Sequence, residues 1–501
     1  MTRGKKLFYN TVSSLIYQII TIICGFVLPR LILESYGSAV NGLVNSITQF
    51  LGVVTFLEMG IGAVIQSSLY QPLAEHDSDQ ISRIVVSATR FFRRIAVILV
   101  GYVCVMLVFY PTISDMQFSW LYIATLIVAM AVSVFMQYYF GAVDQLLLTA
   151  DQHGYIRYNV QTITVILNTA ICCTMIYGGA SIQAVKLVTA FVYLLRPIVL
   201  RMYLCRHYNI DWHIKYESEP IKQKWNGIAQ HVAAVILDGT DTIVLTLFST
   251  LESVSIYSVY YLVVRGVKQL FMAMTNGVQA ILGELWAKHE DEALNQTFSW
   301  VEWCIHTGTS FVFGCTAVLI VPFVQVYTKG VTDANYTQPL FAAFLVAANA
   351  MHCLRLPYNL MVLAAGHYKQ TQRNYVEVAL INIIVSVLTV KAFGLIGVAI
   401  GTVVAMSYQT LWLARYNSKQ LINWPFHRVV KQFAVDIAEI VVIALLTNML
   451  AMSTIDYFSW VMLACCTAGI ALTVIVLFNL ILYKEMSSKL FKTVMTKLKY
   501  K

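Results

Sequence analysis

Charged residues are scarce in this sequence: only 12% of its 501 residues are Asp, Glu, Lys or Arg, whereas 58% are hydrophobic. A soluble globular domain has about twice that share of charged residues, roughly a quarter. The hydrophobic residues also gather in runs of roughly 20, the length at which an α-helix crosses the hydrocarbon core of a bilayer. These features exclude a soluble fold and predict an all-α membrane protein.

Motifs of enzymes and metal centres are missing. The chain has no phosphate-binding glycine loop, no H-E-x-x-H and no G-x-S-x-G, and its ten histidines and ten cysteines show no metal-ligand or redox spacing. No basic helix or stacking-aromatic module for nucleic acid is present either. We therefore expect no catalysis, metal, cofactor or nucleic-acid partner.

The apolar runs predict about 14 transmembrane helices. Of the 34 Lys and Arg residues, 26 fall at the two termini or in alternate links, and Lys329 is the only clear case in the other links. The protein is expected in the bacterial cytoplasmic (inner) membrane. Because positive residues stay on the cytoplasmic side, both termini are expected to be cytoplasmic. The predicted spans lie near 8–33, 40–69, 95–111, 119–143, 157–177, 183–203, 225–248, 254–281, 298–322, 338–364, 375–391, 397–415, 432–452 and 459–483.

The links between these spans leave little room for an external domain. The longest outer link, near 323–337, has about 15 residues. The longest inner links, 70–94 and 201–224, are predicted to form amphipathic helices at the membrane surface, with arginines directed to headgroups. A polysaccharide polymerase or ligase needs a larger outer segment for its catalytic groups, so this enzyme class is disfavoured.

A faint internal repeat divides the chain. A shift of 216 pairs Ile65 with Ile281, and a shift of 214 pairs His153 with His367 and, further along, Asn168 with Asn382 and Arg201 with Arg415. Such identities predict two pseudo-symmetric six-helix lobes that point the same way. The expected domains are 1–210, 211–416 and a C-terminal helix pair with a basic tail, 417–501.

Ionisable residues within the predicted spans are candidate functional groups, because each costs about 2.5–3.5 kcal/mol on insertion scales. Asp238 and Asp241 are three residues apart near the middle of one span, and Arg265 and Lys268 are three apart in the next. The other candidates are Arg30, Glu58, Arg196, Glu302, His306, Arg355 and Glu377.

Two interpretations of these charges stay open. In the first, cations line a cavity for an anionic substrate, and carboxylates bind protons or Na⁺ that drive transport. In the second, Asp238 and Asp241 form structural ion pairs with Arg265 and Lys268. For Glu302 and His306, near the cytoplasmic end of a span, we expect hydrated or snorkelling side chains.

Two stretches of sequence resemble a known family. The first runs through Leu28-Pro29-Arg30, Tyr36-Gly37 and Asn41-Gly42 to Phe56-Leu57-Glu58-Met59-Gly60. The second contains Thr240-Asp241-Thr242 and Glu284-Leu285-Trp286-Ala287. Both are similar to Wzx-type bacterial polysaccharide transporters, the O-antigen and capsule flippases of the multidrug/oligosaccharidyl-lipid/polysaccharide exporter superfamily.

The resemblance implies alternating access by two lobes and translocation of an undecaprenyl-diphosphate-linked oligosaccharide for surface polysaccharide biosynthesis. By position, it assigns substrate binding to Arg30, Arg196, Arg265, Lys268 and Arg355, and H⁺ or Na⁺ coupling to Glu58, Asp238 and Asp241. The implied partners are membrane lipids and the polymerase and glycosyltransferases of the same pathway. The competing interpretation is a cation-coupled multidrug antiporter of the same superfamily.

Overall fold

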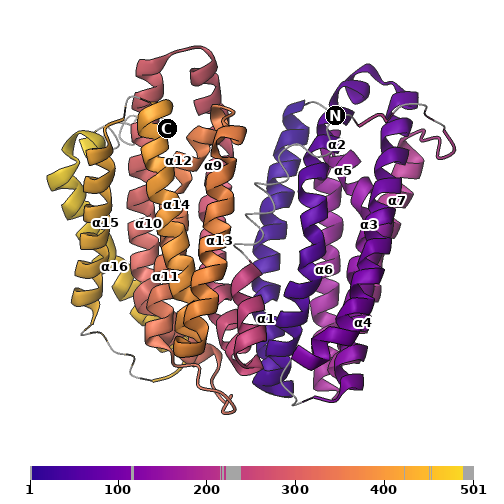
Figure 1. The fold of residues 1–501 in the computed structure, drawn as a ribbon, viewed down its shortest axis with the longest axis horizontal. Coiled ribbons are helices and arrows are strands. Elements are labelled where there is room, and N and C mark those ends of the chain that lie inside the picture. The colour runs from indigo at the N-terminus through magenta and orange to yellow at the C-terminus, as the bar shows by residue number, and fades with distance from the viewer. Residues whose placement is uncertain are drawn as a thin grey trace. The chain divides into compact units, whose positions relative to one another are not determined.

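The computed structural model consists of helices joined by short links (Figure 1). The structure describes residues 3–113, 118–214, 216, 219–221, 239–422, 424–448, 450, 452 and 454–488. Within these residues no strand is formed. The chain divides into two compact units, residues 1–235 with 249–255 and residues 236–248 with 256–501.

The first unit contains seven labelled α-helices. Ser119 and Ser181 cap two of them, each accepting a hydrogen bond from the backbone N–H three residues on. The helices are α1 (Arg3–Gly52), α2 (Phe56–Glu75), α3 (Ser78–Ile113), α4 (Trp120–Met136), α5 (Ala142–Ala150), α6 (Gly154–Tyr177) and α7 (Ile182–His207), with a 3₁₀ turn at Val53–Thr55 and a π-helix at Gln137–Gly141.

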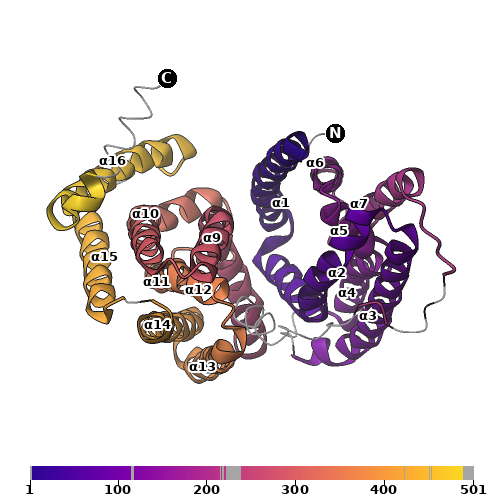
Figure 2. The same cartoon turned by 90° about the horizontal axis from the view of Figure 1, so that it is seen from above.

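The second unit begins with a short apolar helix, Gly239–Phe248. Seen from above, α15 and α16 lie at its rim beside α10 (Figure 2). Its labelled helices are α9 (Leu251–Ala287, whose first turn belongs to the first unit), α10 (Asp291–Tyr327), α11 (Pro339–Leu354), α12 (Leu356–Ala364), α13 (Tyr368–Phe393), α14 (Leu395–Gln420), α15 (Phe426–Thr447) and α16 (Tyr457–Leu482).

Ten helices among the described residues are long and apolar enough to cross a membrane. The predicted all-α membrane class is therefore confirmed, whereas the count of 14 and the domain boundaries stay predictions. Several predicted spans are subdivided. The span predicted over 338–364 is broken at Arg355, and the one over 119–143 passes through the π-helix and continues to Ala150.

The first two predicted spans are joined by a continuous helical stretch that is interrupted at one glycine, Gly37. Gly37 has φ 85° and ψ 172°, so the continuous helical stretch α1 contains a sharp change of direction there. Residues other than glycine rarely adopt this φ. Gly37 therefore allows the chain to turn back with almost no loop.

The link 70–94 differs from the prediction of a separate surface helix. Residues from Ser78 onward belong to α3, which has 36 residues and a length of about 54 Å, well beyond the ~30 Å hydrocarbon core. Its two faces are as predicted, since Ile84 and Phe92 are buried while Arg83 and Arg90 are exposed. The apolar face packs on protein and not on lipid. In the link 201–224, α7 ends at His207, and the described residues after it are not helical.

Helix bounds recur with the shift predicted for the repeat. Both ends of α5 recur 214 residues later in α12, and α6 and α13 begin 214 residues apart. The irregular segments recur as well: the π-helix ends at Gly141, and the same shift leads to Arg355, the break between α11 and α12. The two units thus interrupt the same helix at the same place.

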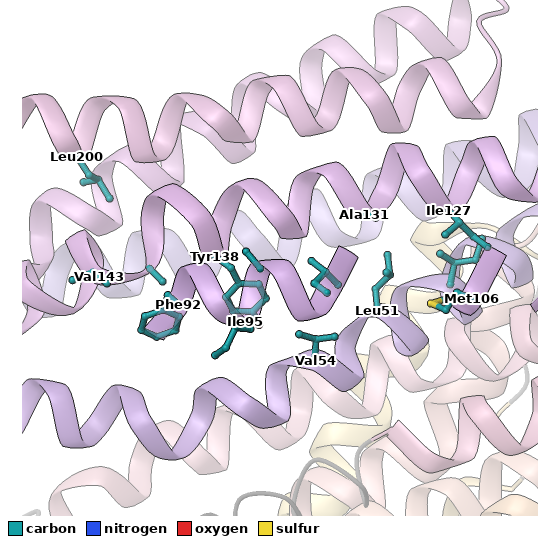
Figure 3. Close-up of a cluster of buried hydrophobic side chains, with 14 of the residues drawn as sticks. Leu51, Val54, Phe92, Ile95, Met106, Ile127, Ala131, Tyr138, Val143 and Leu200 are labelled. Atoms are coloured by element: carbon teal, nitrogen blue, oxygen red, sulfur yellow. The ribbon is translucent and has the colours of Figure 1, made fainter. Parts of the chain in front are cut away.

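The core of the first unit is formed by apolar side chains from α1 to α7. Phe92 and Tyr138 stack with parallel rings, 6.4 Å between centroids, and Ile95 and Leu200 lie in the same cluster (Figure 3). Side-chain hydrogen bonds join the helices as well; the hydroxyl of Tyr110 donates to Ser46 Oγ at 2.6 Å. In a bilayer such bonds and close packing hold helices together, because lipid is as apolar as the core.

Helices α13 and α14 approach closely through a small-residue motif. Gly397 and Gly401 are four residues apart, as in the G-x-x-x-G pattern of packed membrane helices. A Cβ on Gly397 would lie 2.6 Å from the carbonyl carbon and oxygen of Thr389 on α13. The Thr389 hydroxyl donates to the carbonyl oxygen of Gly397 at 2.8 Å. The two backbones therefore meet where neither helix has a side chain between them.

We expect Gly397→Ala to lower the free energy of unfolding by about 1–3 kcal/mol, because the added methyl overlaps backbone atoms that have no room to move. Thermal unfolding of the purified protein in detergent measures this. Gly101→Ala is the control, since a Cβ there would meet nothing within 4 Å. Equal melting temperatures for the two variants would contradict the close contact.

Candidate functional site

Two of the predicted substrate-binding cations lie in the first unit, on different helices. Arg30 follows Pro29 in α1, is partly buried, and its guanidinium lies 3.6 Å from the carboxylate of Glu34. Arg196 in α7 donates from Nε to Thr164 Oγ1 at 2.7 Å and covers the ring of Tyr193 at 3.9 Å. Each cation is held by a partner on its own helix or a neighbouring one.

Asp241, a predicted ion-coupling residue, is 3% exposed and lies where three helices of the second unit meet. It accepts a hydrogen bond from the hydroxyl of Tyr257 on α9 at 3.0 Å. Thr402 Oγ1 on α14 lies 3.0 and 2.9 Å from its two carboxylate oxygens. A hydroxyl has one proton, so Thr402 donates to one of these oxygens at a time.

Asn382 extends this group to α13. Its Nδ2 donates to Thr402 Oγ1 at 3.0 Å, while its Oδ1, fully buried, has no hydrogen-bond partner among the described residues. We call Asp241, Tyr257, Thr402 and Asn382 the Asp241 site. It contains a carboxylate, two hydroxyls and an amide oxygen, and such oxygen ligands suit a proton or a hard cation.

Three basic residues form a second group, which we call the basic cluster: Lys268 on α9, His352 on α11 and Arg355 at the break before α12. Lys268 and Arg355 are each 8% exposed, and both act electrostatically on His352 and on Cys353 beside it. Arg355 donates to Gln409 Oε1 on α14. The positive charges of Lys268 and Arg355, both buried near His352, favour an anion such as phosphate.

The break at Arg355 follows from the next two residues, Leu356-Pro357. Proline has no backbone N–H and disfavours helical geometry in the residue before it, so the helix is interrupted at this point. The side chain of Arg355 is thereby placed at the junction between α11 and α12.

The expectation for Glu302 and His306 is wrong. The two side chains are 4% and 0% exposed, because α12, α15 and Trp424 cover them. Two buried carboxylates of α15, Asp436 and Glu439, lie beside them, and sequence reasoning missed both. The sequence did contain a signal for them, because Asp436 and Glu439 are two acidic residues three apart in an apolar run.

The remaining predicted residues are not gathered in either group. Arg265 is exposed, so it is separated in environment from Lys268, three residues away on the same helix. Glu377, partly exposed, accepts hydrogen bonds from Arg373 Nε at 2.7 Å and from Tyr408 at 2.6 Å. Glu58 belongs to α2, but its side chain lies outside the described part, as does Asp238 altogether.

Solved structures of membrane transporters share this fold. The chain is similar to the lipid II flippase MurJ in an inward closed conformation, with 14% identity, 95% of this chain and 99% of that chain covered, and a TM-score of 0.72. It is similar to a multidrug resistance MATE family transporter of the MOP superfamily in an inward-facing conformation (14% identity, 80% and 94% covered, TM-score 0.58). It is also similar to a MATE transporter of Vibrio cholerae (12% identity, 83% and 97% covered, TM-score 0.59).

No protein-family model matches the sequence, and no curated protein sequence matches it. The structural similarity is nevertheless consistent across nearly the whole chain. The protein therefore has the fold of MOP-superfamily transporters and is a multi-pass membrane protein, as the sequence predicted. The similar structures named above are transporters and a flippase, not enzymes.

We expect Thr402→Val and Tyr257→Phe each to lower the free energy of unfolding by about 1–3 kcal/mol, because each removes a donor from a buried carboxylate. In an Asp241→Asn background both effects should shrink, which a double-mutant cycle in detergent measures. Thr473→Val is the control; this exposed hydroxyl bonds only a carbonyl of its own helix, that of Gly469. Effects of equal size in both backgrounds would contradict the contacts described.

Proposed function

We propose that this protein is a flippase that translocates an undecaprenyl-diphosphate-linked oligosaccharide across the bacterial cytoplasmic membrane by alternating access, for surface polysaccharide biosynthesis. The observation that carries the proposal is the pair of buried cations in the basic cluster, Lys268 and Arg355, which lie near His352 in a fold shared with a lipid II flippase. The 14-helix topology, with both termini on the cytoplasmic side, is part of the same proposal.

A diphosphate-sugar headgroup has no favourable path through hydrocarbon. Its charges and hydroxyls would lose their hydration without replacement over ~30 Å. In our proposal the buried cations replace the hydration of the phosphates through charge-assisted hydrogen bonds. Arg355 contributes a planar donor set suited to phosphate oxygens, and its place at a helix joint lets the bond form in one conformation and open in another.

The Asp241 site is proposed to couple transport to H⁺ or Na⁺. Thr402 on α14, Tyr257 on α9 and Asn382 on α13 contact Asp241 or each other. Binding or loss of a cation at the carboxylate changes how strongly these helices are held together. A ligand that favours one arrangement of helices shifts the population toward it, and this is how an ion gradient would drive the cycle.

A cation-coupled multidrug antiporter is the second candidate. The fold similarity to MATE transporters and the buried carboxylate of Asp241 favour it, because an organic cation needs a negative partner. The basic cluster favours the flippase, since it would repel such a substrate. In either function we assign no catalysis and no bound cofactor, and the flippase would hand its substrate from the glycosyltransferases to a polymerase.

We expect Lys268→Gln together with Arg355→Gln to reduce translocation at least tenfold, because charge-assisted hydrogen bonds contribute about 1.5–3 kcal/mol each. The assay uses purified protein in vesicles that contain the undecaprenyl-diphosphate-linked oligosaccharide and measures the access of a lectin to the outer leaflet. Lys288→Gln is the matched control, because Lys288 is exposed and paired with Glu284 on its own helix. Export of cationic dyes without lectin access would overturn the flippase in favour of the antiporter.

A further inference from the structure

Four titratable side chains are buried between α10 and α15, apart from the Asp241 site and the basic cluster. We call Glu302, His306, Asp436 and Glu439 the acid–histidine cluster. None is more than 4% exposed. The cluster lies against the C-terminal helix pair, which the sequence predicts as an addition to the two lobes.

Hydrogen bonds connect the cluster into a chain. His306 Nδ1 lies 2.6 Å from Asp436 Oδ2 and donates to that carboxylate. The hydroxyl of Tyr358, on α12, donates to Glu302 Oε1 at 2.6 Å and lies 3.5 Å from His306 Nε2. A continuous series of polar atoms therefore runs from Asp436 through His306 and Tyr358 to Glu302.

The charges of the cluster do not balance. Three carboxylates face one imidazole, and among the described residues no lysine or arginine forms an ion pair with them. Even with His306 protonated, two negative charges would remain in the protein interior. Keeping protons on the carboxyl groups costs less free energy than holding those charges unpaired.

Charged and titratable groups on the surrounding elements do not alter this count. Tyr358 of α12 and Tyr483, directly after α16, lie near the carboxylates but carry no positive charge. The nearby cations are exposed and occupied with aromatic rings: Arg428 covers Trp424 at 5.0 Å, and Lys431 covers Tyr483 at 5.5 Å.

The polar side chains next to the carboxylates do not compensate their charge. Ser310 donates its single proton to Asp436 Oδ1 at 3.2 Å. Gln432 Nε2 donates to the same oxygen at 3.2 Å, and neither group carries a positive charge. Thr309, on the same face of α10 as Glu302 and His306 at 3.6 residues per turn, is fully buried, and its hydroxyl has no partner among the described residues.

We infer that the acid–histidine cluster is a proton-binding site, and that its loading links the C-terminal helix pair to α10 and α12 during transport. A proton passes from hydronium to a carboxylate oxygen: one O–H bond breaks and leaves water, and one O–H bond forms on the carboxyl group. When the proton leaves, the repulsion between the carboxylates of α10 and α15 rises and favours their separation. The proton-binding claim is independent of the substrate; the link to transport rests on the proposed function.

Infrared spectroscopy of the full-length protein in lipid tests the binding claim directly. We expect a band from protonated carboxyl groups at neutral pH that decreases as the pH is raised. It should be lost in Glu302→Gln with Glu439→Gln, and reduced in Glu439→Gln alone if the double variant does not fold. Glu377→Gln is the matched control, because this carboxylate has Arg373 as a permanent partner and should contribute no such band.

Two results would overturn the binding claim. One is a spectrum without a protonated carboxyl band that these substitutions remove. The other is a band that appears only when Na⁺ is withdrawn, which would make the cluster a Na⁺ site.

The linkage is tested in the vesicle assay: a pH gradient should accelerate translocation by the wild type and by Glu377→Gln but not by Glu439→Gln. An unchanged response of Glu439→Gln would overturn the linkage. Failure of every variant and of the wild type to translocate would reject the proposed substrate, while the infrared result would stand.

Discussion

The constraint on which this structure depends is that a bilayer offers no water to polar groups, so every buried charge must find its partners inside the protein. The backbone satisfies this by pairing its polar groups within helices; no strand is formed among the described residues. The side chains satisfy it in three local groups of the second unit, and each group joins helices that are distant in sequence. Thr402 reaches Asp241 across 161 residues, and Asp436 reaches His306 across 130. The hydrogen bonds that stabilise the helix bundle therefore also position its buried ionisable side chains.

The three groups differ in sign and in partners, which separates their roles. The basic cluster concentrates positive charge beside a helix break, at the place that we propose for an anionic headgroup. The Asp241 site surrounds one carboxylate with hydroxyls and an amide. The acid–histidine cluster has more carboxylates than basic groups, and all four of its titratable side chains are buried. The proposed anion site and the two proposed sites for small cations differ in sign, as we expect of an ion-driven carrier whose driving ion and phosphate-containing cargo have opposite charges.

The sequence predicted most of the helices because hydropathy depends only on length and composition. Ranges such as 157–177 and 459–483 agree with α6 and α16 within a few residues. Hydropathy does not tell which neighbour covers a helix face, and this is why Glu302 and His306 were expected at a hydrated end. For the same reason, the sequence could not distinguish Arg265 from Lys268: they are three residues apart on one helix, but Arg265 is exposed and Lys268 is buried. Thr402 and Asn382 were not among the candidate site residues because neither is charged, and only the fold shows that they lie at a carboxylate.

The close approach of α13 and α14 has a consequence for the Asp241 site. Gly401 directly precedes Thr402, and the carbonyl oxygen of Asn382 lies 3.1 Å from the place that a Cβ of Gly401 would take. The glycine is therefore the reason that Asn382 and Thr402 are near enough to bond each other. Because α13 and α14 are in backbone contact along this seam, we expect Asn382 and Thr402 to move together. Opening of the site would then separate both of them from Asp241 and Tyr257.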